Sequence, residues 1–289
     1  ALLGFTLPAY QRGEVSLDRL EAIFEAPPNI RDSQAAIALP HPVGHLRAQN
    51  LTFTYPGADR PALNQVNFTV EPGQTVAVVG PIGSGKSTLA MALPRLLEIE
   101  PGQLFLDGHD TTQIALSDLR GAIAFVPQDS FLFSTTIKNN VRYGDPMAEQ
   151  MEVEHAAQAA QLYSEILNFP QQFKTMVGER GITLSGGQRQ RSALSRALLV
   201  DAPILVLDDA LSSVDNQTAT QILDTLSSGA GRKTVIFVSH QMSAAASCDR
   251  ILVMDAGHIV QSGTHSELVS QPGLYQDLWN QHKLKEVLQ

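Results

Sequence analysis

The stretch that most constrains this chain is GPIGSGKST, at residues 80–88. An apolar run at residues 75–79 precedes it and a helix-compatible run at residues 87–97 follows it, giving the order strand, glycine loop, helix. Such glycines let successive backbone N–H groups turn toward one anion, and the helix N-terminus adds partial positive charge. The pattern predicts a loop that holds the phosphates of a nucleoside triphosphate, formed by Gly80, Gly83, Ser84, Gly85, Lys86, Ser87 and Thr88.

Two side chains of this loop suit separate parts of the ligand. Lys86 can reach the β- and γ-phosphates, and the Ser87 hydroxyl can bind Mg²⁺. The alternative is a chance match in a glycine-containing turn. The strand before the loop and the helix after it make that alternative the weaker one.

The composition fits a globular α/β protein, because 43% of the residues are hydrophobic and only 17% are charged. The formal net charge is −9 and we find no basic stripe, so we expect no nucleic-acid partner. The single cysteine, Cys248, excludes an internal disulfide and suits a reducing compartment. No stretch approaches the roughly 18–20 apolar residues of a membrane span, and we recognise no signal peptide.

The first 44 residues do not read as the start of a domain, and the chain opens on Ala1 rather than Met. We therefore expect a piece of a longer protein. Residues 1–8 are apolar, residues 15–24 have helical spacing beside a charged face, and Pro27-Pro28 ends that predicted helix. The following residues read as a linker, although a tail that merely packs on the domain is the alternative. We expect the globular unit to begin near His45.

The rest of the chain alternates predicted strands and helices. This alternation implies a mostly parallel sheet. Pro94 predicts a kink or an early stop in the helix after the glycine loop. The predicted strands are residues 46–55, 66–70, 75–79, 103–108, 122–128, 204–207 and 234–238, with a hairpin at residues 251–262.

Four of the predicted strands end in polar residues. One ends at the glycine loop, and the others end at Gln128, at Asp208-Asp209 and at Ser239-His240. Each of these ends is ordinary alone, but in an open parallel sheet the ligand lies beyond the carboxyl ends of the strands. One edge would gather a phosphate loop, an amide, two carboxylates and an imidazole, which are the groups for metal-assisted nucleotide hydrolysis. We expect Asp208 to hold Mg²⁺ together with Ser87.

A second glycine motif, LSGGQRQR at residues 184–191, decides the family. Ser185, Gly186 and Gly187 open a predicted helix, and this terminus can bind a second anion or simply cap the helix. Between the glycine loop and the strand that ends in Asp208, the motif is highly specific. From about residue 45 to the end, the chain resembles the ATP-binding cassette domain of ABC transporters. The resemblance implies an α/β P-loop NTPase (RecA-like) fold, mostly parallel, with an antiparallel β subdomain and a helical subdomain inserted at about 130–195.

The resemblance also implies roles at matching positions. Tyr55 matches the aromatic residue that stacks on adenine, although an edge-strand aromatic is the alternative. Gln128 matches the loop that senses Mg²⁺ and contacts the membrane domain. His240 matches the histidine that contacts the γ-phosphate, and SSVD, residues 212–215, matches the loop that crosses to a partner cassette. Gln128, Asp209 and His240 are thus the expected catalytic set, and Gln128, Ser87 and Asp208 the expected metal set.

In this family two cassettes enclose two ATP molecules, each between the glycine loop of one chain and the second glycine motif of the other. The residues offered to the partner's ATP would be Ser185, Gly186, Gly187 and Gln188. VGERG, residues 177–181, and residues 1–44 resemble an exporter-type half-transporter, the latter as the end of its last membrane helix and a linker. The implied partners are a second cassette and a transmembrane domain of the same polypeptide, at the cytoplasmic face of the plasma (inner) membrane.

One position departs from the family pattern. Active cassettes carry Glu directly after the Mg²⁺-binding Asp, as general base, and this chain carries Asp209. The shorter side chain would place its carboxylate about 1 Å or more from the usual position, and such a misplacement can cost about a hundredfold in rate. With LSGGQ intact, this resembles the half of a heterodimeric exporter that carries a weak ATP site. The alternative is a homodimer in which Asp209 works slowly.

The same sequence also bears on other classes of function. A chromosome-maintenance ATPase of this superfamily would need a long coiled coil between Gln128 and Ser185, and the interval is too short for one. A GTPase would need an N-K-x-D motif, which the sequence lacks. A non-hydrolytic nucleotide-binding module stays open, because Asp209 is compatible with it. The transported substrate cannot be read from this chain.

Overall fold

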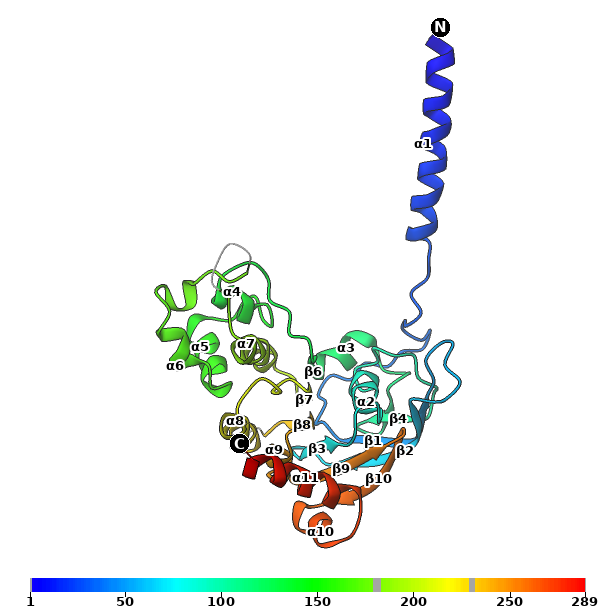
Figure 1. The fold of residues 1–289 in the computed structure, drawn as a ribbon. Coiled ribbons are helices and arrows are strands. Elements are labelled where there is room, and N and C mark those ends of the chain that lie inside the picture. The colour runs from blue at the N-terminus through cyan, green and yellow to red at the C-terminus, as the bar shows by residue number, and fades with distance from the viewer. Residues whose placement is uncertain (1, 179–182, 229–231, 289) are drawn as a thin grey trace. The chain divides into compact units, whose positions relative to one another are not determined.

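The computed structural model describes residues 2–178, 183–228 and 232–288 (Figure 1). The chain divides into two compact units, Ala1–Arg31 and Asp32–Gln289. The first unit is built on helix α1, Leu2–Phe24, which contains Pro8. The helix includes the predicted stretch 15–24 and begins earlier, because a proline removes only one helical N–H and the helix continues through Pro8. Among the described helices, none combines the length and the apolar character needed to cross a membrane.

The second unit begins before the first strand, because the preceding segment is hydrogen-bonded to it. The Leu39 N–H donates to the Asp118 carboxylate at 2.9 Å. The Asp107 carboxylate accepts the N–H groups of Val43 and His45, each at 2.8 Å. The segment is therefore fixed to the unit by backbone hydrogen bonds.

Gly44 continues this attachment, and its carbonyl accepts the Thr234 hydroxyl at 3.0 Å. Thr234 is the first residue of a central strand of the main sheet and is fully buried. The segment before His45 therefore reaches the main sheet as well as the loop at Asp107.

The main sheet has six strands in the order β10-β9-β3-β8-β7-β6. The five strands from β9 to β6 are parallel, and β10 pairs antiparallel with β9. Strands β3, β7 and β8 are buried along their whole length, as expected of Val-, Ile- and Leu-rich strands covered on both faces. The strands are β3 Thr75–Val79, β6 Ile123–Val126, β7 Ile204–Asp208, β8 Thr234–Val238, β9 Arg250–Asp255 and β10 His258–Gly263.

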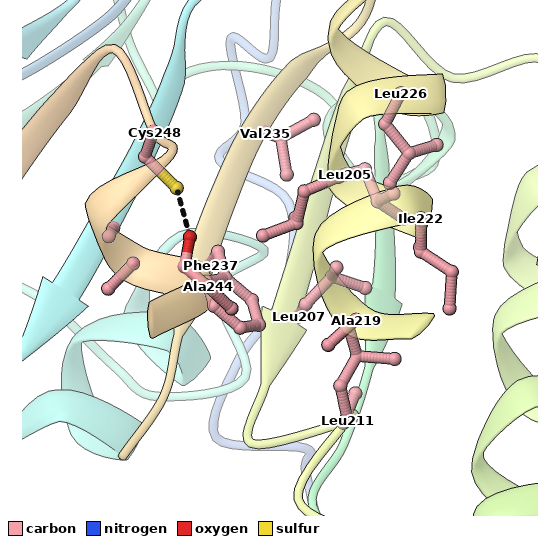
Figure 2. Close-up of a cluster of buried hydrophobic side chains, with 14 of the residues drawn as sticks. Leu205, Leu207, Leu211, Ala219, Ile222, Leu226, Val235, Phe237, Ala244 and Cys248 are labelled. Carbon is pink, nitrogen blue, oxygen red and sulfur yellow. Dashed lines mark hydrogen bonds between the residues drawn. The ribbon is translucent and has the colours of Figure 1, made fainter. Parts of the chain in front are cut away.

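One face of this sheet packs against helices. Alternate side chains of a strand point to opposite faces, and Leu205, Leu207, Val235 and Phe237 share the face beneath α8 and α9 (Figure 2). Burying each such side chain contributes about 1.5–3 kcal/mol. The helices linked to this core are α7 Gly186–Leu199, α8 Asn216–Ser227, α9 Met242–Ala246, α10 His265–Ser270 and α11 Leu274–Leu288.

The opposite face packs against helix α2 and a second sheet. Val76, Val78, Val206 and Ile236 belong to this second core. Helix α2, Lys86–Ala92, stops two residues before Pro94, so the predicted early stop is confirmed. The second sheet is antiparallel, in the order β2-β1-β4-β5. Its strands are β1 Leu46–Phe53, β2 Leu63–Val70, β4 Leu104–Leu106 and β5 His109–Asp110. Helix α3, Leu116–Gly121, follows β5 in the chain.

A helical region between β6 and β7 has its own core, which includes Ile137, Val153, Ile166 and Phe173. Its elements are α4 Ile137–Arg142, α5 Gln150–Ala159, α6 Tyr163–Leu167 and the 3₁₀ turn Gln172–Lys174 (Figure 1). Helix α7 packs on this core and on the main sheet. The predicted fold is confirmed: a mostly parallel sheet, an antiparallel β subdomain and an inserted helical subdomain.

Candidate functional site

The carboxyl ends of β3, β7 and β8 border a cavity of about 560 Å³. The polar strand ends that the sequence analysis grouped on this edge meet here, although they lie as far apart in the chain as Gly83 and His240. The cavity is lined by Tyr55, Ala62, Ile82, Gly83, Ser84, Gly85, Lys86, Ser87, Thr88, Gln128, Asp208, Asp209, Val238 and His240.

The glycine loop at the floor of the site depends on two glycines for its shape. Gly80 has φ +151° and Gly85 has φ +100°, a region that favours glycine. A Cβ at Gly80 would lie 2.1 Å from the carbonyl oxygen of Met254, and a Cβ at Gly85 would lie 2.4 Å from that of Ala62. Both the backbone conformation and the space therefore require glycine.

Lys86 lies folded into this loop. Its ammonium donates to the carbonyl oxygens of Gly80 at 2.9 Å and Pro81 at 2.7 Å, and the residue is only 6% exposed. Burial lowers the pKa of Lys86, and the nearby carboxylates of Asp209 and Asp208 oppose that shift. The site thus holds a cation at the point where the sequence predicts phosphate.

Asp208 and Ser87 face each other across the cavity floor. The Ser87 hydroxyl donates to Asp208 Oδ1 at 2.9 Å. Burial raises the pKa of Asp208, the Ser87 hydrogen bond lowers it, and Asp209 raises it further. A hydroxyl and a carboxylate oxygen this close, with Gln128 on the same cavity, form a donor set of the kind that a hard cation prefers.

Asp209 follows β7 in a left-handed backbone conformation, φ +48°. Its N–H donates to the Val238 carbonyl at 2.9 Å. Its Oδ1 is buried, and within the described part of the chain it has no hydrogen-bond partner. A buried carboxylate oxygen with free lone pairs, on the lining of a cavity, is able to accept a proton from a bound molecule.

Three further predicted residues line the cavity from its sides. Tyr55 stands two residues after β1, is 38% exposed, and lies edge-on to Phe53 with 4.9 Å between ring centroids. Its hydroxyl is 3.3 Å from the Thr88 hydroxyl. Gln128 and His240 are exposed. An aromatic ring, an amide and an imidazole thus line the same cavity as the glycine loop.

The second glycine motif lies outside this cavity. Ser185 caps α7 with a reciprocal box: its hydroxyl accepts the Gln188 N–H at 3.2 Å, and the Gln188 side chain accepts the Ser185 N–H at 2.9 Å. The Gln188 side chain also donates to Glu165, which binds Arg191 at 2.7 Å. Gly186 lines a separate cavity of about 410 Å³, and Gln128 borders both cavities. In the described chain, the two predicted halves of an ATP site, the glycine loop and LSGGQ, thus do not share a cavity.

The comparison with protein families is decisive once this geometry is known. A profile described as "ABC transporter" matches residues 63–212, just over half of the chain. The chain belongs to the ABC transporter family. The match spans the glycine loop, LSGGQ and the strand that ends in Asp208.

Several ABC transporter proteins are similar over nearly the whole chain. The multidrug resistance-like ATP-binding protein MdlA of Escherichia coli is 42% identical over 278 residues, covering 96% of this chain and 47% of that protein. An ATP-dependent lipid A-core flippase of Pseudomonas aeruginosa is 43% identical over 257 residues, covering 88% and 43%. The chain thus spans less than half the length of these relatives.

Among solved structures, a bacterial Atm1-family ABC exporter with ATP bound superposes with a TM-score of 0.91 at 36% identity. The alignment covers 97% of this chain and 49% of that one. The fold of this ABC domain is therefore that of an exporter cassette.

Sequence reasoning missed two polar side chains that bond to the loop after β7. Gln190 lies within LSGGQRQR, and Gln241 directly follows His240, but no role was predicted for either. The signal for Gln190 is its place on the buried side of an otherwise amphipathic helix, where it is 7% exposed. The VGERG motif, residues 177–181, lies mostly outside the described residues.

Proposed function

We propose that the chain is the ATP-binding and hydrolysing domain of an exporter, and that ATP-dependent pairing of two such cassettes drives transport. The observation that carries the proposal is the division of the site. The glycine loop, Asp208, Asp209 and His240 share one cavity, while Gly186 of LSGGQ lines another. A nucleotide held in the first cavity needs LSGGQ from a second cassette to be enclosed.

The residues present fit MgATP. Lys86 is placed for the β- and γ-phosphates, and Tyr55 offers an aromatic face for adenine. Ser87 and Asp208, with Gln128, would hold Mg²⁺, which neutralises phosphate charge when bound. His240 would contact the γ-phosphate, and Asp209 would accept the proton of the attacking water.

Residues 1–44 would be the end of a membrane domain and a linker, and residues 45–289 the cassette. The flippase relative and the exporter structure support a place beside a membrane domain, which we expect at the cytoplasmic face of the inner membrane. Asp209 in place of Glu supports a heterodimer in which this chain's own ATP site is the weak one. In that assembly its LSGGQ would complete the active site of the partner.

The second candidate is a nucleotide-binding regulatory half that does not hydrolyse ATP, and Asp209 is the observation that favours it. Single-turnover hydrolysis with enzyme in excess over radiolabelled ATP separates the two functions. A slow but measurable conversion that requires Mg²⁺ and disappears in Lys86→Ala supports an ATPase. Tight MgATP binding with no conversion, in the assembled transporter, would establish the regulatory half instead.

A further inference from the structure

Helix α6 places one carboxylate against the first turns of α7. Glu165 accepts the Gln188 side-chain amide on Oε2 at 2.9 Å, and its other oxygen, Oε1, lies 2.7 Å from Arg191 Nη2. Gln188 and Arg191 are three residues apart, so they lie on the same side of the helix. The two oxygens of one carboxylate therefore bind two side chains of the helix that begins in LSGGQ.

Arg191 extends this connection to the backbone on both sides. Its Nη1 donates to the Gln161 carbonyl oxygen at 2.8 Å, and its Nε donates to the Gly187 carbonyl oxygen at 3.3 Å. Gln161 lies between α5 and α6, and the Arg191 side chain is only 12% exposed. Because the donors of a guanidinium are fixed in one plane, these bonds hold the corner between α5 and α6 against the start of α7.

The bond to Glu165 restrains the side chain that closes the capping box of LSGGQ. The Gln188 side chain accepts the Ser185 N–H at 2.9 Å, and the Ser185 hydroxyl accepts the Gln188 N–H at 3.2 Å. The hydroxyl is an acceptor in this box and Ser185 is exposed, so its own proton can be donated to a bound anion. The direction of that donor thus depends on Gln188, and the position of the Gln188 side chain depends on Glu165.

The charge of Glu165 needs its partner for a second reason. A carboxylate near a helix N-terminus would repel the phosphates that this terminus is expected to receive, and the Arg191 cation compensates it. The Glu165 side chain is 35% exposed, so the ion pair contributes little to stability. Within the described residues, Glu165 lines neither the cavity at the glycine loop nor the one that Gly186 lines. Glu165 can therefore act on a nucleotide only through other residues.

We propose that Glu165 is a positioning residue for LSGGQ. It holds the Gln188 side chain in the capping box, and the box aims the Ser185 hydroxyl at the partner's nucleotide. Arg191 fixes the carboxylate and compensates its charge. The inference rests on the proposed pairing of two cassettes, and it adds a side chain of the helical region to the half-site that this chain offers to its partner.

The first test uses the intact transporter with its partner. Glu165→Leu removes the acceptor for Gln188, so kcat for ATP should fall about fivefold while KM stays within about twofold. Glu165→Gln keeps an oxygen that can accept the Gln188 amide, and should recover about half of the wild-type kcat or more. Glu154→Leu is the matched control, because Glu154 on α5 also accepts a glutamine amide, that of Gln150 at 2.8 Å. This control should change neither constant.

Hydrogen exchange in the nucleotide-free transporter supplies a readout that does not require turnover. The Gln188 backbone amide should exchange about tenfold faster in Glu165→Leu than in the wild type or in Glu165→Gln, because the capping box loosens. The amides at the other end of α7, near Leu198, should keep their wild-type rates, which shows that the variant is folded.

Three results would overturn the inference: wild-type kcat in Glu165→Leu, a Gln variant no better than Leu, or equal exchange of the Gln188 amide in Glu165→Leu and the wild type. A transporter that binds MgATP without hydrolysing it contradicts only the proposed ATPase. In that case the exchange rate of the Gln188 amide alone supports or overturns the positioning role of Glu165.

Discussion

The chain contains two glycine motifs at helix N-termini, and they use glycine for different reasons. In the loop before α2, Gly80 and Gly85 have positive φ, and a side chain there would strike backbone of the same domain. At the start of α7, Gly186 and Gly187 belong to the helix itself, and a side chain would instead strike Ser213. The first motif needs glycine for its conformation and the second for its neighbours.

The two motifs also differ in charge. The first encloses the buried ammonium of Lys86 and faces Asp208. The second is closed by a neutral capping box between Ser185 and Gln188. Arg189, which follows this box, lines the same cavity as Gly186. We therefore expect the first motif to provide affinity for the nucleotide, and the second to contribute only when a partner's nucleotide reaches it.

The largest expected effect is on the first motif. Lys86→Ala should weaken MgATP binding about 100-fold, roughly 3 kcal/mol, because charge-assisted hydrogen bonds to the phosphates are lost. Isothermal titration calorimetry on the domain measures this, and Lys174→Ala, an exposed lysine in the helical region, is the control. Equal affinities in the two variants would remove Lys86 from the binding site.

Glycine substitution in the second motif should separate turnover from binding. Gly187→Ala should lower ATP turnover of the assembled transporter about tenfold or more, because the methyl group displaces Ser213. ATP affinity of the isolated domain should stay within twofold. Gly121→Ala on α3, where a Cβ would meet nothing within 4 Å, controls for helix substitution. Loss of affinity in Gly187→Ala would show that the two motifs are not distinct in role.

Lengthening the carboxylate of the first site should raise its rate. Asp209→Glu should increase turnover about 10- to 100-fold with ATP affinity nearly unchanged, since a general base must reach the water it activates. The gain should vanish when His240→Ala is added. The assay needs the assembled transporter, including its partner. A homodimer that turns over briskly with Asp209 and slows with Glu would refute the weak-site proposal.

The smallest effect concerns stability without nucleotide. Burial raises the pKa of Asp208, so at pH 7 the folded protein carries this charge at a cost that the unfolded chain does not have. Asp208→Asn should raise Tm by about 2–4 °C at pH 7, or about 1 kcal/mol. The Tm difference between Asp208→Asn and the wild type should disappear as the pH falls through the raised pKa, because Asp208 then becomes protonated and loses its charge. Scanning calorimetry without Mg²⁺ at several pH values measures this difference. A Tm difference that does not depend on pH would show that packing, and not the charge of Asp208, is its cause.

The structural features that could be predicted from the sequence follow from a single residue type or from a general rule of sheet topology. Pro94 stops α2, and the polar ends of β7 and β8 meet at the glycine loop because parallel strands share an edge. The hydrogen bonds of Gln190 and Gln241 to the loop at residues 211–214 could not be predicted, because a glutamine is as common on a surface as in such a place and only tertiary packing shows its partners. Strand β2 likewise begins at Leu63, earlier than its own residues indicate, because pairing with β1 extends it.

The attachment of residues 32–44 has a mechanical consequence. Val43 and His45 are bound to Asp107, and Gly44 is bound to Thr234, the first residue of β8. The far end of β8 leads to Ser239 and His240. Tension applied to the backbone ahead of His45 would therefore be resisted by the hydrogen bonds to Asp107 and Thr234 before it could reach the nucleotide cavity.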